Sequence, residues 1–158
     1  MSSPHASTFI YVTYIRTTPE KLWSALTDTD FMQQYWFNAR VESDFKKGSP
    51  WRIVLEDGRV ADTGEILEAK PPKRLVIKWR NEFKPELKAE GYAICTMELE
   101  PVADAVKLTI THSIDKENAK FIEAVSGGWP KILSNLKSLM ETGSLALQEA
   151  YPKESARA

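Results

Sequence analysis

The sequence is poor in the residues that build redox and metal sites: among 158 residues it has one cysteine, Cys95, and two histidines, His5 and His112. A single cysteine excludes an internal disulfide, and no group of His and Cys residues has the spacing of metal ligands. The sequence also contains no Walker-type loop and no GxGxxG element, which are the patterns of nucleotide binding. We therefore expect no metal and no cofactor.

An excess of charge of one sign is absent as well. The 21 basic and 22 acidic side chains leave a net charge of -1, which gives no electrostatic reason to expect a nucleic-acid or anionic-membrane partner. No stretch approaches the roughly 18 consecutive apolar residues that a membrane span needs. Residues 1–7 contain no apolar core of a signal peptide. These absences together predict a cytoplasmic protein without a membrane span.

The composition that is present is that of a globular domain, with 42% hydrophobic and 27% charged residues. Strand patterns recur between turn signals such as Asp57-Gly58, a strong hairpin dipeptide, and Pro71-Pro72. The chain becomes extended near Asn38, and six further strands are predicted at 8–15, 51–56, 60–69, 73–80, 92–100 and 106–114. Gly64 lies inside one of these strands and indicates a bulge or a sharp bend.

Helical signals occur in two places. After the first strand, Thr18 can cap a short helix that begins at Pro19, and Asp28 can cap a second one. The clearest amphipathic helix spans 127–143, with Pro130 at its first helical position and Gly143 as its left-handed C-terminal cap. Its apolar positions recur at steps of three and four residues: Trp129, Ile132, Leu133, Leu136, Leu139 and Met140. A separate helical segment at 116–125, capped by Asp115, is expected before a break at Ser126-Gly127-Gly128.

These elements predict an α+β fold. Short connections favour pairing of sequential strands, so we expect a curved antiparallel sheet of about seven strands wrapped around the long C-terminal helix. Two short helices follow strand one. We predict a single domain at 8–143, with flexible tails at 1–7 and 144–158.

Several runs resemble a known family. They are LWSALTDTDFMQQYWF (22–37), GEILEAKPPKRLVIKW (64–79), MELEP (97–101), LTITHS (108–113) and GGWPKILSNLKSLMETG (127–143). Together they resemble the START/SRPBCC superfamily and, more narrowly, the activator of heat shock protein 90 ATPase homologue-like family, which is linked by name to polyketide cyclases and dehydrases. The resemblance implies a helix-grip (START/Bet v 1-like) fold with an apolar cavity between sheet and helix. That family has no universal catalytic motif.

Large side chains of the predicted inner faces are the candidates for lining this cavity. They are Trp36, Trp51, Trp79, Met97, Ile110, His112, Trp129, Leu133 and Leu136. Several converging tryptophans can line a space or fill it, so a packed core is the alternative to a ligand cavity.

Among these candidates His112 is the titratable one. On the apolar face that it shares with Leu108 and Ile110, His112 should be partly desolvated. It could orient a ligand carbonyl or act as a general base, or it could have a structural role by hydrogen bonding to a neighbouring backbone group or tyrosine. Ser113 and Asp115 do not share its face, so the spacing makes no catalytic triad.

The other polar and reactive side chains can be explained without a functional role. Asp62, Glu65 and Arg52 are candidate polar groups at the cavity edge, although charged strand positions are usually solvated. Cys95, on an inward face, has the pattern of a small buried hydrophobe.

Three functions follow. The first is the binding of a small hydrophobic or aromatic molecule in the cavity, and it rests on the convergent tryptophans and on the family resemblance. No catalytic motif is visible in the sequence. The second is cyclase, dehydratase or hydrolase chemistry in the same cavity with His112 as acid or base. The third is a protein-interaction role like that of the chaperone ATPase activators, although we expect one domain here, without the additional N-terminal domain that the resemblance implies for the eukaryotic activators. The chain is expected to be a monomer or a homodimer.

Overall fold

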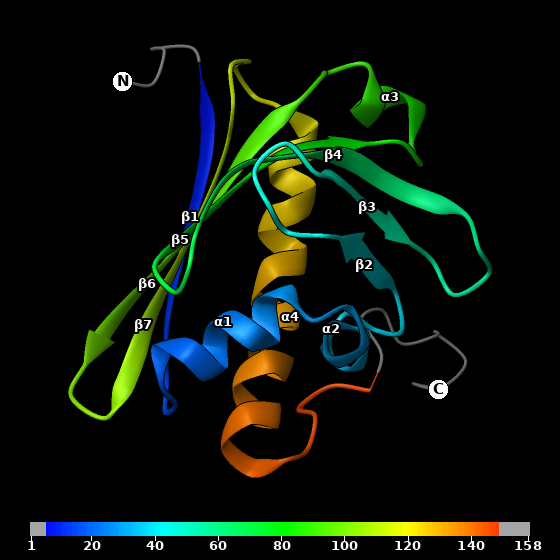
Figure 1. Cartoon of the computed structure of the whole chain (residues 1–158). Coiled ribbons are helices and arrows are strands. Elements are labelled where there is room, and N and C mark those ends of the chain that lie inside the picture. Colours follow the sequence, from blue (N-terminus) through cyan, green and yellow to red (C-terminus); the bar gives the residue numbers. More distant parts are fainter. Residues whose placement is uncertain (1–5, 149–158) are drawn as a thin grey trace, which may run out of the picture.

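A curved antiparallel sheet of seven strands wraps around one long helix in the computed structural model, which describes residues 6–148 (Figure 1). The strand order across the sheet is β1-β7-β6-β5-β4-β3-β2, so β1 and β2 form the two edges. The strands are β1 (Ser7–Ile15), β2 (Arg40–Ser43), β3 (Pro50–Val54), β4 (Val60–Lys70), β5 (Arg74–Asn81), β6 (Ala93–Val102) and β7 (Ala105–Ile114). The helices are α1 (Pro19–Thr27), α2 (Thr29–Tyr35), α3 (Pro85–Lys88) and α4 (Lys120–Thr142). The predicted helix-grip architecture is confirmed.

Alternation of side chains along the strands creates the inner face of the sheet. Every second pair of residues across the β6–β7 ladder is buried, as are Cys95 with His112 and Met97 with Ile110. Their neighbours in sequence point outward to the convex face. Since successive side chains of a strand lie on opposite faces, this alternation places one apolar surface against α4.

Gly64 allows β4 and β5 to approach closely. A Cβ atom at this position would lie 1.6 Å from the carbonyl oxygen of Lys78, so no other residue fits without moving the backbone. The register shift in the same pair of strands lies between Ile66 and Glu68. Bulges of this kind increase twist and bend a sheet, which helps it to curve around a helix.

The two short helices begin as the sequence predicts. Thr18 Oγ1 accepts a 3.2 Å hydrogen bond from the Lys21 N–H, and Asp28 Oδ1 accepts one of 3.1 Å from the Phe31 N–H. Pro19 occupies the first helical position of α1. The segment 81–90, between the strands predicted at 73–80 and 92–100, contains the one-turn helix α3.

The prediction of two separate C-terminal helical segments is wrong. Helix α4 runs without interruption from Lys120 to Thr142, so it passes through Gly127-Gly128 and carries Pro130 inside it. Phe121 and Trp129 are both buried. Their packing against the sheet offsets the low helix propensity of Gly127, Gly128 and Pro130. Tertiary contacts therefore override the local signal.

The N-terminal cap of α4 also differs from the prediction. Asp115 does not cap it; instead the carboxylate of Glu90, from the segment before β6, accepts hydrogen bonds of 2.9 and 2.8 Å from the N–H groups of Lys120 and Phe121. A carboxylate at this end also interacts favourably with the helix dipole. At the other end Gly143 adopts φ 82° and its N–H bonds to Leu139, as predicted.

The chain after α4 folds back onto the helix. Asn135 is fully buried, and its side-chain amide exchanges hydrogen bonds of 2.7 and 2.9 Å with the backbone of Leu147. At the other end, Ser7 belongs to β1 and pairs with Ile114. The remainder of the predicted tails, 1–5 and 149–158, lies outside the described residues.

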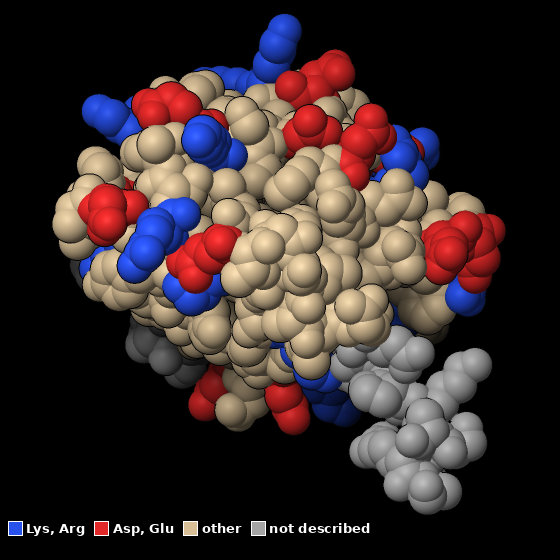
Figure 2. Space-filling model, turned by 90° about the horizontal axis from the view of Figure 1, so that it is seen from below, with Lys and Arg blue, Asp and Glu red and all other residues tan. Residues whose placement is uncertain are grey.

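Two absences concern the described part of the chain. None of its helices combines the length and the apolar character that crossing a bilayer requires. Within residues 6–148 no three His, Cys, Asp or Glu side chains come together as a metal site. On the face shown in Figure 2, acidic and basic side chains are interspersed around an uncharged centre, in keeping with the balanced composition.

Candidate functional site

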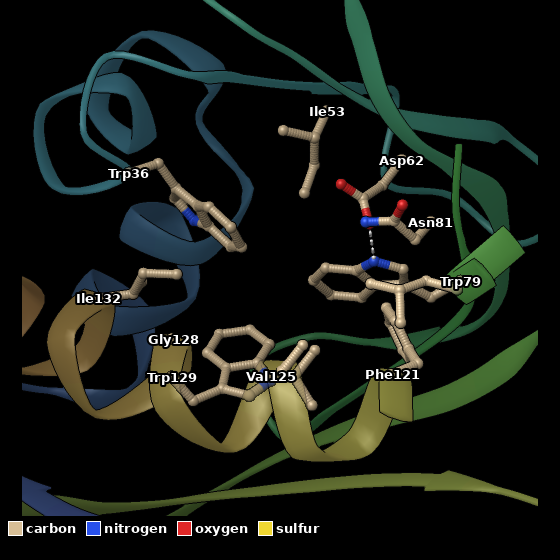
Figure 3. Close-up of a pocket in the computed structure, with 12 residues that line it drawn as sticks. Trp36, Ile53, Asp62, Trp79, Asn81, Phe121, Val125, Gly128, Trp129 and Ile132 are labelled. Carbon is tan, nitrogen blue, oxygen red and sulfur yellow. Dashed lines mark hydrogen bonds between the residues drawn. The ribbon is translucent and has the colours of Figure 1, made fainter. Parts of the chain in front are cut away.

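A cavity of about 190 Å³ opens between the sheet and the first half of α4 (Figure 3). Its walls come from β3, β4, β5, α3, α4 and the end of α2. The lining residues are Trp36, Ile53, Asp62, Trp79, Asn81, Leu87, Phe121, Ala124, Val125, Gly128, Trp129 and Ile132. The lining is mostly apolar, which is typical of small-molecule sites.

Trp79 is the centre of an aromatic cluster around this cavity. Its ring centroid lies 6.2 Å from that of Trp36, 5.7 Å from that of Trp129 and 4.4 Å from that of Trp51. Trp36 and Trp129 meet edge to face at 5.6 Å. Three indole rings from α2, β5 and α4 therefore border one space (Figure 3).

Asp62 is the one ionisable residue of the cavity lining. The side chain comes from β4, is 8% exposed and accepts a 2.7 Å hydrogen bond from Trp79 Nε1. Burial raises the pKa of Asp62 to about 6, the charge of Glu82 adds to this rise, and hydrogen bonds from Trp79 and Asn81 oppose it. In Figure 3 Asp62 and Asn81 lie side by side at one wall of the cavity.

The charges just outside the cavity are neutralised among themselves. Glu82 forms ion pairs with Arg80 at 2.5 Å and with Lys88 at 3.2 Å, and it accepts a 2.9 Å hydrogen bond from Thr63 Oγ1. The Arg80 hydrogen bond is the main reason that the pKa of Glu82 is lowered to about 2. Asp62 has no such basic partner among the described residues of the lining.

His112 lies in the core behind the aromatic wall and does not line the cavity. Its Nδ1 accepts a 3.1 Å hydrogen bond from Trp129 Nε1, so the ring proton is on Nε2, which has no partner among the described residues. The rings of Trp79 and Phe121 lie 4.8 and 5.1 Å from the imidazole. Burial lowers the pKa of His112 to about 3, so it is neutral at physiological pH.

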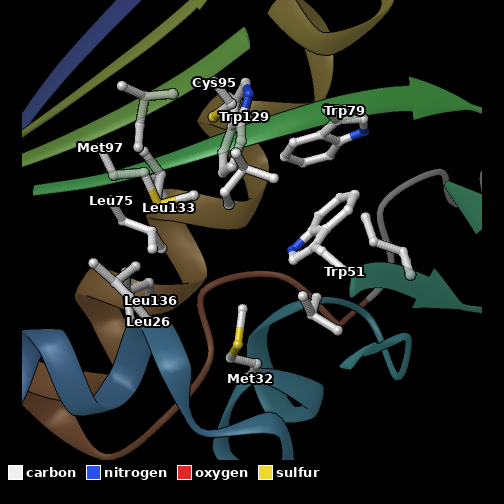
Figure 4. Packing of buried hydrophobic residues seen from close by; sticks show 14 of the residues in the cluster. Leu26, Met32, Trp51, Leu75, Trp79, Cys95, Met97, Trp129, Leu133 and Leu136 are labelled. Carbon is white, nitrogen blue, oxygen red and sulfur yellow. The ribbon is translucent and has the colours of Figure 1, made fainter. Parts of the chain in front are cut away.

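Three of the nine predicted lining residues, Trp36, Trp79 and Trp129, border the cavity. The other predicted residues lie in the core: Trp51, Met97, Ile110, His112, Leu133 and Leu136 are at most 3% exposed. Figure 4 shows Met97, Leu133 and Leu136 among neighbouring apolar side chains of the core. Part of the space between sheet and helix is therefore filled and part of it is open.

Of the remaining polar and reactive candidates, one lines the cavity and the others lie on the surface or in the core. Of the three polar residues considered for the cavity edge, Asp62 lines the cavity, Glu65 is exposed, and Arg52 forms a 2.8 Å ion pair with Glu42 on the outside. Cys95 is fully buried in the core, and burial raises the pKa of its thiol.

Sequence reasoning missed most of the α4 wall. The positions 121, 124, 125, 128, 129 and 132 follow helical steps of three and four residues and form one stripe. That signal was present, but the assumed break at Gly127-Gly128 divided it. Asn81 and Leu87 were missed because they lie between the strands predicted at 73–80 and 92–100, where no element was predicted.

A model of one protein family matches residues 16–141 of the chain; its description is Activator of Hsp90 ATPase homolog 1-like protein. A search of curated protein sequences found no match.

Solved structures with the same fold include CalU16 from Micromonospora echinospora (23% identity, 87% of this chain and 78% of that one, TM-score 0.69). An Aha1 dimer from Colwellia psychrerythraea is 21% identical over 87% of this chain and 98% of that one, with a TM-score of 0.71. An HSP90 activator from Plasmodium falciparum is 24% identical over 84% and 94%, with a TM-score of 0.68. At these identities the similarity establishes the fold.

Proposed function

The chain belongs to the family of Activator of Hsp90 ATPase homolog 1-like proteins, and we propose that it binds a small hydrophobic or aromatic molecule in the cavity between its sheet and α4. The observation that carries this proposal is the open space bordered by Trp36, Trp79 and Trp129. An apolar protein cavity of about 150 Å³ is sufficient to hold benzene. A volume of about 190 Å³ therefore suits a ligand with one ring.

The walls offer both contact area and rigidity. The side chains of Trp79 and Trp129 are each 3% exposed and are fixed by hydrogen bonds to Asp62 and His112. Trp36 is half-buried, and its ring meets that of Trp129 edge to face. Because the rings are already held in place, a ligand would bind without a large ordering cost.

An enzymatic role for His112 has less structural support. A general base must come within hydrogen-bond reach of its substrate, and the rings of Trp79, Trp129 and Phe121 surround His112 in the core. Its imidazole contacts none of the open volume. Binding is therefore the function that the geometry supports best.

Adjacent glycines in α4 give a matched pair of variants for a test. Gly128 lines the cavity and Gly127 is exposed, and an added Cβ atom would meet nothing within 4 Å at either position. We would measure the thermal stability of the wild type, Gly128→Leu and Gly127→Leu against a library of small hydrophobic and aromatic compounds. A ligand that binds only the native state raises the melting temperature by mass action.

We expect one chemical class to give a saturable increase in melting temperature for the wild type and for Gly127→Leu, but not for Gly128→Leu. Loss in both variants would indicate a general effect on the helix. An increase that survives in Gly128→Leu, or no increase with any compound, would refute binding in this cavity.

A protein-interaction role is the second candidate, and the edge of the sheet favours it. Strand β1 contains no charged residue and no proline, although such residues commonly protect edges. Ile10, Val12 and Tyr14 on this strand are 61%, 44% and 49% exposed. Two structural relatives are named for Aha1 and for HSP90 activation, so an Hsp90 chaperone is the partner to test.

Addition of the protein to an Hsp90 should increase its ATPase rate if this candidate is correct. Val12→Glu should abolish the increase, whereas Gly128→Leu should retain it because no residue of β1 lines the cavity. Neither complex formation nor a change in ATPase rate with the wild type would eliminate the candidate.

A further inference from the structure

We infer that the ligand of the cavity is a small organic cation, held with its positive group between the tryptophan rings and the Asp62 carboxylate. This inference rests on the proposed function and narrows it from hydrophobic molecules in general to amphipathic ones with an ammonium group. The juxtaposition that carries it is one acidic side chain in an otherwise uncharged aromatic lining.

Among residues 6–148, Asp62 has no basic ion-pair partner, which a buried carboxylate normally has. Only 8% of the residue is exposed, and its hydrogen bonds come from the neutral side chains of Trp79 and Asn81. No Lys, Arg or His is among the cavity-lining residues. Buried charges in proteins are usually paired, so a cation in the cavity would supply the interaction that the protein itself leaves out.

The aromatic rings favour the same kind of ligand. A cation within about 6 Å of an indole centroid is attracted by the negative face of the ring, and tryptophan gives the strongest attraction of this kind. Trp36, Trp79 and Trp129 border the cavity with their ring centroids 5.6 to 6.2 Å apart. Phe121 adds a fourth aromatic side chain to the lining.

The ionisation of Asp62 is compatible with this role. With a pKa of about 6, the carboxylate is mostly ionised at pH 7.5 and becomes protonated below pH 6. Glu82 is the charged group that acts on it, and Arg80 and Lys88 hold that glutamate outside the cavity. From α4, α3 and β3 the cavity is faced only by uncharged side chains, including Phe121, Leu87 and Ile53.

An anionic ligand fits the site poorly. The Asp62 charge would repel it, and no basic side chain of the lining would compensate. A neutral ligand of the same shape gains the apolar contacts but leaves Asp62 without an ionic partner. The expected order of affinity is therefore cation, neutral molecule, anion.

Three cyclohexyl compounds of similar size separate these cases: cyclohexylammonium, cyclohexanol and cyclohexanecarboxylate. Their dissociation constants would be measured by NMR titration at pH 7.5 with the wild type, Asp62→Asn and Glu65→Gln. Glu65→Gln removes the same charge from an exposed position of the same strand and serves as the matched control.

We expect cyclohexylammonium to bind the wild type and Glu65→Gln about tenfold or more tightly than cyclohexanol, and Asp62→Asn to lose this preference while it still binds cyclohexanol. In the wild type the preference should also decrease at pH 4.5, because Asp62 is then protonated and neutral while cyclohexylammonium keeps its positive charge. If Asp62→Asn does not fold, this measurement on the wild type tests the inference.

Equal binding of ammonium and alcohol by the wild type would overturn the inference and leave the proposed function intact. A preference for the ammonium that persists in Asp62→Asn would also overturn it. If none of the three compounds binds, both the inference and the proposed cavity function fail.

Discussion

The indole N–H of Trp79 donates a 2.7 Å hydrogen bond to the carboxylate of Asp62, and this bond connects the centre of the aromatic cluster to the ionisable group of the cavity. The two residues lie on adjacent strands, β5 and β4. The position of the Trp79 ring and the charge of Asp62 are therefore coupled. Changes at either residue should affect the cavity and the fold together.

Asp62→Asn is expected to stabilise the protein at neutral pH. The pKa of Asp62 in the folded protein, about 6, lies above its value in the unfolded chain. The stabilising contribution of the protonated carboxyl group to the free energy of unfolding is therefore full below about pH 4 and is lost as pH rises through 6. Above pH 6 the free energy of unfolding should be about 3 kcal/mol higher for Asp62→Asn than for the wild type, and the asparagine oxygen can still accept the Trp79 hydrogen bond. Urea unfolding of both proteins between pH 4 and pH 8 measures this difference.

The variant should gain stability relative to the wild type as pH rises, and the gap should close near pH 4. Glu65→Gln, with an exposed side chain on the same strand, should follow the wild type. Parallel curves for Asp62→Asn and the wild type would show that Asp62 is not desolvated as described.

His112 should impose the opposite pH dependence. Burial lowers the pKa of His112 to about 3. The contribution of the neutral imidazole to the free energy of unfolding is therefore full above the unfolded pKa near 6.5 and is lost as pH falls toward 3. Over that whole range the loss amounts to about 5 kcal/mol. His112→Phe removes the titrating group and keeps a ring among Trp79 and Phe121, so its unfolding free energy should change less with pH.

The same variant leaves Trp129 Nε1 without its acceptor, which should cost about 1–3 kcal/mol at pH 7.5. Denaturant unfolding at pH 7.5 and pH 5 separates the two effects. A His112→Phe protein with a pH profile as steep as that of the wild type would argue against a neutral, buried imidazole.

Glu90 should be important for α4 although it is 30 residues away from the helix start in sequence. Glu90→Ala removes the acceptor for the Lys120 and Phe121 N–H groups and should destabilise the protein by about 1–2 kcal/mol. Glu86→Ala, on α3, changes the same type of side chain without removing a cap. Equal unfolding free energies for the two variants would exclude capping by Glu90.

Gly127 lowers the helix propensity of α4 without a packing reason. The residue is exposed and has space for a Cβ atom, so Gly127→Ala should stabilise the protein by about 1 kcal/mol in thermal or urea unfolding. A destabilised variant would mean that the backbone at this position requires glycine.

The elements of the fold could be predicted because their signals are local. Thr18, Asp28 and Gly143 cap helices through groups a few residues away, and alternation along β7 specifies its buried face. The continuity of α4 could not be predicted in this way, because Gly127-Gly128 and Pro130 are tolerated only through packing of the helix against the sheet.

The site was predicted less completely for a related reason. The spacing of Trp79 and Trp129 identified inward positions, but spacing does not tell whether the volume beside a side chain is filled, as at Leu133, or open, as at Gly128. The burial of Asp62 depends on residues from other strands and from α4. Such contacts join segments distant in sequence, and no local pattern encodes them.

The five tryptophans provide the most direct test of a ligand site in this cavity, because each indole N–H gives a separate NMR signal. Titration with cyclohexylammonium should shift the signals of Trp36, Trp79 and Trp129, which line the cavity, while that of Trp23 on α1 stays in place. Unchanged indole signals at saturating ligand, or a shift confined to Trp23, would contradict binding between the sheet and α4.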